Sequence, residues 1–69
     1  MIEELKEVEK VGDFVIKLIG IDNAVFEVII ELNRTTLEVI DFWDLKEAYL
    51  KMEELQEKMI KENILRGLK

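Results

Sequence analysis

The chain has 69 residues, 49% of them hydrophobic, and carries a formal net charge of −6 without any cysteine or histidine. This length allows one small domain over residues 1–69 with a marginal core, and the composition excludes intrinsic disorder, disulfides, zinc–thiolate sites and histidine-based catalysis. The acidic charge disfavours direct binding to nucleic acid, because clustered lysine and arginine are needed to bind a phosphate backbone.

Residues 2–11 are expected to form a short N-terminal helix. Ile2, Leu5 and Val8 recur at nearly helical spacing, and Gly12 follows them as a helix end. Charged side chains four residues apart repel each other in this segment, which weakens the helix: Glu3 with Glu7, and Lys6 with Lys10. The segment also lacks the apolar run of a signal peptide, so none is expected.

Three later segments alternate in polarity with the period of a β-strand: residues 13–20, 24–32 and 35–42. They predict a three-stranded antiparallel meander. A three-residue loop at 21–23 sets Lys17 opposite Glu27, which is an attractive cross-strand pair. A two-residue loop would mix the two faces of the sheet, so we predict the odd loop.

The second turn of the meander is predicted at Asn33-Arg34, which pairs Ile30 with Leu37. In this register one face of the sheet is wholly apolar, and the C-terminal helix would cover it. That face comprises Phe14, Ile16, Leu18, Phe26, Val28, Ile30, Leu32, Leu37 and Val39.

The opposite face of the meander is more apolar than a solvated sheet face usually is. It would carry Val15, Ile19, Val25, Ile29, Ile40 and Phe42, interleaved with charged residues that include Glu27 and Glu31. Three explanations fit this face: the N-terminal helix packs on it, its β-branched residues serve strand propensity alone, or it is an interface. An interface would bind a second copy of the chain or another protein.

The last third of the chain predicts one long amphipathic helix from Leu45 to Arg66. Asp44 and Glu47 form a variant of the capping box, and Trp43 is placed to begin a hydrophobic staple. The stripe that would lie on the sheet comprises Leu45, Ala48, Tyr49, Met52, Leu55, Gln56 and Met59.

This helix is expected to be longer than the sheet beneath it. It spans about 33 Å at 1.5 Å per residue, whereas a strand of eight residues spans about 26 Å. The apolar residues that fall off the stripe are Leu50, Ile60, Ile64, Leu65 and Leu68. We therefore expect the first half of the helix to pack on the sheet and the second half to dock on a partner.

The negative charge is concentrated on the strands and not on the helix. Residues 13–44 carry seven acidic and two basic side chains, whereas residues 45–69 carry five acidic and six basic ones. A basic protein partner fits this distribution. Small domains without disulfides or metals commonly oligomerise, and we therefore expect a homodimer.

The sequence contains no motif for catalysis or for a cofactor. It lacks phosphate-binding glycine spacing, a calcium-loop pattern and any nucleophile–base pair. We expect no enzyme activity, no cofactor and no bound metal. The most apolar window, residues 14–32, includes four charged side chains, so we expect no membrane span and a cytoplasmic protein.

The predicted architecture is α+β, with a short N-terminal helix, a three-stranded antiparallel meander and a long C-terminal helix packed on one sheet face. The predicted function is non-catalytic protein binding, as a small acidic inhibitor, an antitoxin-like protein or a regulatory adaptor of the kind that phages and plasmids encode. Two alternatives stay open: a structural homo-oligomer without another partner, and a small-molecule binder with its pocket between helix and sheet or at a dimer seam. The candidate interface residues are Val15, Ile19, Val25, Glu27, Ile29, Glu31, Ile40, Phe42, Leu50, Ile60, Ile64, Leu65 and Leu68.

Overall fold

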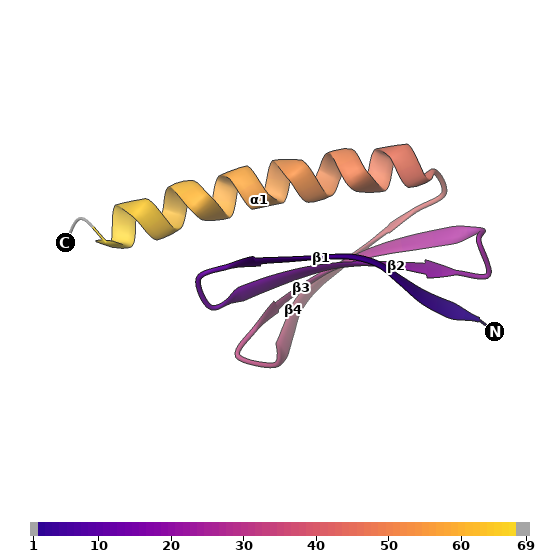
Figure 1. Ribbon diagram of the computed structural model, residues 1–69, viewed down its shortest axis with the longest axis horizontal. Coiled ribbons are helices and arrows are strands. Elements are labelled where there is room, and N and C mark those ends of the chain that lie inside the picture. Colours follow the sequence, from indigo (N-terminus) through magenta and orange to yellow (C-terminus); the bar gives the residue numbers. More distant parts are fainter. Residues whose placement is uncertain (1, 68–69) are drawn as a thin grey trace.

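The protein is an antiparallel sheet with one long helix lying along it (Figure 1). Its structure, a computed structural model, describes residues 2–67, and the side chains of residues 2–62. The sheet is a four-stranded meander in the order β1-β2-β3-β4. The elements are β1 (Glu3–Val11), β2 (Phe14–Ile21), β3 (Val25–Leu32), β4 (Thr35–Phe42) and α1 (Leu45–Gly67). The predicted α+β class, the antiparallel sheet and the C-terminal helix packed on it are confirmed, but the sheet has four strands and not three.

The first element is a strand, so the predicted N-terminal helix is wrong. β1 pairs with β2 through the two-residue turn Gly12-Asp13, in which Gly12 has a φ of 59°, as the first position of a type II′ hairpin turn requires. The register shifts by one residue at Lys6, which is the extra residue of a β-bulge. Because of this bulge, Leu5 and Val8 lie on the same sheet face although they are three residues apart. That spacing is what imitated a helix.

The turn between β2 and β3 has the predicted odd length but lies one residue further along, at Asp22-Asn23-Ala24. Its first two residues have positive φ (53° and 55°), a conformation that Asp and Asn tolerate. The register is therefore shifted by two residues, which preserves the predicted faces of β2 and β3 but changes the pairs. Lys17 forms its ion pair with Glu31, at 2.9 Å between Nζ and Oε1, and not with Glu27.

Asn33-Arg34 forms the turn between β3 and β4, as predicted, and both residues have the positive φ of a type I′ turn. Beyond this turn the register shifts by one residue, which leaves Leu37 as the extra residue of β4. A shift of one residue exchanges the two faces of a strand. Ile40 therefore lies opposite Val28 on the helix side, and Val39, which was predicted beneath the helix, lies on the other face.

α1 begins at the predicted cap residue. The Asp44 carboxylate accepts a hydrogen bond from the Lys46 amide at 3.4 Å, and the Asp44 carbonyl accepts one from the Ala48 amide at 3.1 Å. The predicted hydrophobic staple is wrong, because Trp43 is 80% exposed. Its partner position in a staple is Ala48, which is wholly buried against the sheet and leaves no surface for the indole.

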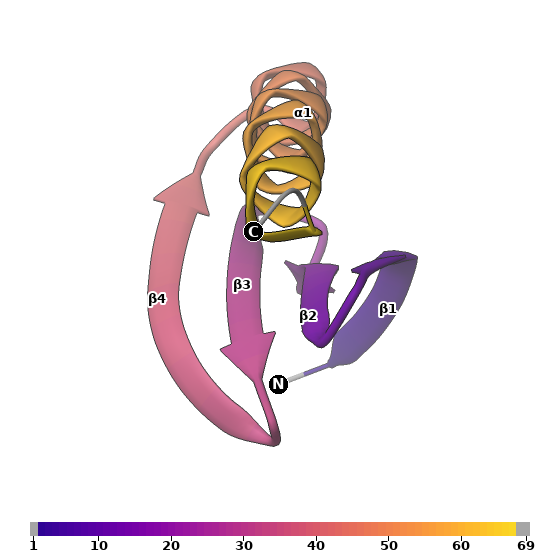
Figure 2. The same ribbon diagram turned by 90° about the vertical axis from the view of Figure 1, so that its left-hand side faces the viewer.

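A single core lies between α1 and one face of the sheet. Alternate residues of β2 and β3 meet the predicted stripe of α1, and the sheet curves round the helix with β4 and β1 on either side (Figure 2). The buried core comprises Val11, Ile16, Leu18, Phe26, Val28, Ile30, Ala48, Met52, Leu55 and Met59. Of the predicted stripe, Tyr49 lies at its border and is 36% exposed. The helix therefore covers one face of the sheet and leaves the other without a layer.

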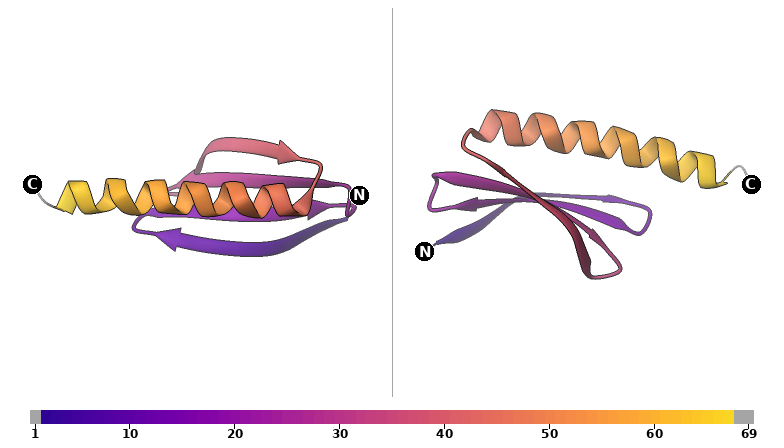
Figure 3. Two further views of the ribbon diagram at one scale, coloured as in Figure 1. Left: turned by 90° about the horizontal axis from the view of Figure 1, so that it is seen from above. Right: turned by 180° about the vertical axis from the view of Figure 1, so that it is seen from behind.

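The C-terminal end of α1 projects past the ends of the strands, as predicted from the lengths (Figure 3). The helix has 23 residues, or about 34 Å at 1.5 Å per residue. Seen from above, it lies over β2 and β3 and continues beyond them (Figure 3). The sheet thus supports only the first part of the helix.

Candidate functional site

The sheet face turned away from α1 has no covering layer among the described residues, and we call it the open face. Among the residues that the structure describes, no helix or strand lies over it (Figures 1 and 2). Its apolar members are Leu5, Val8, Val15, Ile19, Ile21, Val25, Ile29 and Val39. Its charged members are Glu3, Lys10, Lys17, Glu27, Glu31 and Asp41.

Within the described part of the chain, apolar side chains on the open face are shielded by their neighbours on the same sheet. Leu5 and Val39 are 57% and 48% exposed, whereas the six others are partly buried. Ile29, at the centre, lies between Lys17 and Val39 across the strands. A solvated face of an antiparallel sheet normally carries polar side chains at these positions. The N-terminal segment extends this face as a strand and does not cover it as a helix, which removes the first of the three explanations.

Four of the charged residues of the open face form two pairs. One pair is attractive, and the other brings two negative charges together. Lys17 and Glu31 are joined by the ion pair described above, with both side chains partly buried. Glu27 lies directly opposite Asp41, so two carboxylates are neighbours. Burial raises the pKa of Glu27 above its ordinary value, and the charge of Asp41, a hydrogen bond with Asp41 and the charge of Glu3 raise it further. None of the ion pairs formed among the described residues involves these three carboxylates.

The structure brings six of the predicted interface residues together on the open face and moves two others off it. The six are Val15, Ile19, Val25, Glu27, Ile29 and Glu31. Ile40 and Phe42 were predicted on the same face, and this placement is wrong. The bulge in β4 turns both side chains towards α1, where they pack against the core. They therefore contribute to the support of the helix.

The predicted docking residues of the helix are only partly within the described side chains. Leu50 and Ile60 are 55% and 42% exposed. Ten residues at 3.6 per turn place them about 80° apart around the helix, so they do not form one patch. Single exposed apolar side chains are ordinary on protein surfaces. The other three predicted residues, Ile64, Leu65 and Leu68, lie outside the described side chains.

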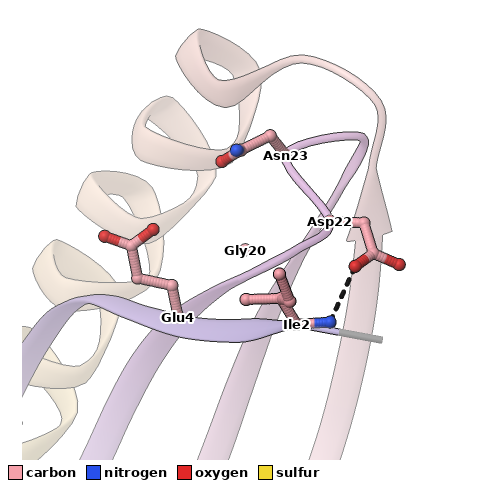
Figure 4. A pocket seen from close by; sticks show the side chains of 5 residues that line it. All are labelled: Ile2, Glu4, Gly20, Asp22 and Asn23. Carbon is pink, nitrogen blue, oxygen red and sulfur yellow. Dashed lines mark hydrogen bonds between the residues drawn. The ribbon is translucent and has the colours of Figure 1, made fainter.

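The hollows of the described surface are small. One, of about 170 Å³, lies at the corner of the sheet, where the Ile2 amide donates a hydrogen bond to the Asp22 carboxylate at 2.7 Å (Figure 4). Another, of about 160 Å³, lies between β1 and α1, next to a hydrogen bond from the Gln56 amide to Glu9 at 3.2 Å. Pockets for small ligands usually have about 300–1,000 Å³. Among the described residues, no three acidic side chains are placed to hold a metal ion.

Sequence reasoning missed the part of the open face that β1 and β4 contribute. Leu5, Val8 and Lys10 were assigned to a helix, and Val39 to the covered face. The signal that would have found β1 is Gly12-Asp13, a dipeptide typical of two-residue hairpin turns. The bulges at Lys6 and Leu37 have no comparable signature, because a bulge depends on the pairing of the whole strand.

The described part of the helix does not combine the length and the apolar character that a membrane-spanning helix needs. Comparison of the chain with protein-family models, with curated proteins and with solved structures found no match.

Proposed function

We propose that the chain is a non-catalytic protein-binding module and that the open face is its binding surface. The observation that carries this proposal is the group of eight apolar side chains, spread over the four strands, on a sheet face that no described helix or strand covers. Antiparallel sheets with one covered face usually expose a polar face to water. Contiguous apolar patches on small proteins mark interaction sites more often than scattered apolar residues do.

Charge supports a protein as the occupant of this face. The chain carries a net charge of −6, and the carboxylates Glu3, Glu27 and Asp41 lie at one end of the open face. Apolar side chains next to unneutralised carboxylates fit a partner that presents apolar groups beside lysine or arginine. A role as a small acidic inhibitor or regulatory adaptor is compatible with this chemistry and is part of the proposal. The small hollows give no comparable support to binding of a small molecule.

Ile29→Asp tests the proposed surface. Ile29 lies at the centre of the open face, and any protein that covers this position would have to remove water from a carboxylate there, which costs free energy. We expect the variant to stay folded by circular dichroism and to lose self-association in sedimentation velocity. It should also lose any protein that the wild type retains in a pull-down. The matched control is Leu50→Asp, which places the same charge at an exposed apolar site on α1 and should change neither result.

Two outcomes would overturn the proposal. The first is unfolding of the monomer by Ile29→Asp, which would make the open face part of the core. The second is a wild-type chain that shows no self-association in sedimentation velocity and, in the pull-down, retains no protein whose binding is lost in Ile29→Asp.

A further inference from the structure

The charges on the open face are arranged along the direction of the strands. Glu3, Glu27 and Asp41 lie towards the end of the sheet that holds the β2–β3 turn, and we call this the acidic end. Lys10 and Glu31 lie at the opposite end, and Lys17, beside the central Ile29, reaches towards that end to pair with Glu31; we call this the lysine end. The face thus has a negative end and an end with an excess of positive charge, with apolar residues between them.

Neither end is neutralised by the described part of the chain itself. Glu3, Glu27 and Asp41 take part in none of the ion pairs formed among the described residues, and the same holds for Lys10. Glu27 lies directly opposite Asp41 on the neighbouring strand, where two negative charges repel each other. At the lysine end, Glu31 forms its ion pair with Lys17 and not with Lys10. A partner that brings positive charge to the acidic end and negative charge to Lys10 would therefore complement this face.

The area of the face fits an interface between two small proteins. Four strands at a spacing of about 4.8 Å and a length of about 26 Å give roughly 500 Å² per copy, and about 1,000 Å² if two such faces meet. A specific interface has to bury at least about that much in total. Two sheets that pack face to face in this way would form a sandwich with strands within about 30° of each other.

We propose that a second copy of the chain occupies the open face, turned end for end about a two-fold axis that runs across the strands. This inference rests on the proposed function and names the partner. The axis places the acidic end of each copy against the lysine end of the other, with Glu3 of one β1 towards Lys10 of the other β1. A two-fold axis parallel to the strands would instead stack the two acidic ends, which like-charge repulsion opposes. The charge pattern therefore selects one of the two symmetric ways of joining these faces.

Charge reversal on β1 tests this arrangement, because Glu3 and Lys10 lie at opposite ends of the strand and do not contact each other within one copy. Glu3→Lys and Lys10→Glu should each weaken self-association roughly tenfold, since each turns two attractive contacts of the dimer into repulsive ones. A mixture of the two single variants should form a heterodimer in which both contacts are attractive again. The double variant Glu3→Lys/Lys10→Glu should associate within about threefold of the wild type. Sedimentation velocity and native mass spectrometry measure both species.

A matched control for Glu3→Lys is Glu57→Lys, which reverses an exposed carboxylate on α1 and makes the same change in net charge outside the open face. It should not change the dissociation constant by more than about twofold. If the single reversals associate as the wild type does, or if the mixture shows no preference for the heterodimer, this arrangement is wrong. The wild-type chain could instead be a monomer that binds another protein and loses it in Ile29→Asp. That result would contradict a second copy on the open face but leave the proposed function intact. If neither self-association nor binding of another protein depends on Ile29, both the arrangement and the proposed function are wrong.

Discussion

Glu27 is a residue of the open face whose pKa is raised, first by burial and then by neighbouring carboxylates. It faces Asp41 across β3 and β4, and Glu3 adds further negative charge from β1. Lys17, on the neighbouring strand β2, is engaged by Glu31. Like charges directly opposite each other in a sheet are destabilising. At this position, therefore, the single chain keeps a repulsion between the carboxylates of Glu27 and Asp41. A positively charged group of a binding partner would relieve it.

Glu27→Gln should stabilise the dilute, monomeric chain at neutral pH. A carboxyl group whose pKa is raised on folding binds more protons in the folded state, so wild-type stability is lost as the pH rises above the ordinary value of 4.5. The glutamine variant does not lose this contribution. Urea denaturation should show a gain of about 0.2–1 kcal/mol in the free energy of unfolding at pH 7 and no gain well below the ordinary pKa of glutamate.

Glu57→Gln serves as its control, because it removes one negative charge from an exposed position on α1. A stability difference for Glu27→Gln that stays constant across this pH range, or that is matched by the control, would contradict the proposed repulsion.

Among the secondary-structure elements, β4 shows how one extra residue changes the role of a whole strand. Its turn at Asn33-Arg34 was predictable from the sequence, but the bulge at Leu37 was not. After the bulge, Ile40 and Phe42 support α1, whereas Val39 joins the open face. In β1 the bulge at Lys6 had a similar effect, since it gave a strand the apolar spacing of a helix. Both errors arise because a strand's faces depend on its pairing and not only on its own sequence.

Neighbouring substitutions in β4 test this bulge. Ile40→Asp places a carboxylate against the core and should lower the free energy of unfolding by about 2–4 kcal/mol, or unfold the chain outright. Val39→Asp makes a matched change at a position that is 48% exposed, and should cost about 1 kcal/mol or less. Urea denaturation of both variants gives the comparison. The opposite order of stability would mean that β4 pairs without the bulge.

On the scale of the whole molecule, the protein has one core on one side of a sheet. Its 69 residues place it in the size range in which a single core gives only a small margin of stability. The described chain contains no disulfide. Covering the open face with a second copy would give the sheet a second apolar layer. Association and stability should therefore be linked in this protein.

The melting temperature should consequently depend on protein concentration. If unfolding is coupled to dissociation of a dimer, each tenfold rise in concentration above the dissociation constant should raise the midpoint by roughly 3–6 °C. Differential scanning calorimetry over a hundredfold concentration range measures this shift. Ile29→Asp should abolish the concentration dependence, whereas Leu50→Asp should keep it. A wild-type midpoint that is constant over this range would speak against an association that stabilises the fold.

Local patterns in the sequence were sufficient to determine the helix, its Asp44 cap, the turn at Asn33-Arg34, the odd length of the turn between β2 and β3, and the apolar faces of β2 and β3. These features depend on residues close together in the chain, such as the helical spacing of Ala48, Met52 and Leu55. The pairing of β1, the two bulges and the exchange of Val39 with Ile40 were decided only by the tertiary structure. The physical reason is that a strand gains its backbone hydrogen bonds and its orientation from a neighbouring strand. The open face, which is made by four strands together, could therefore be predicted only for its two central strands.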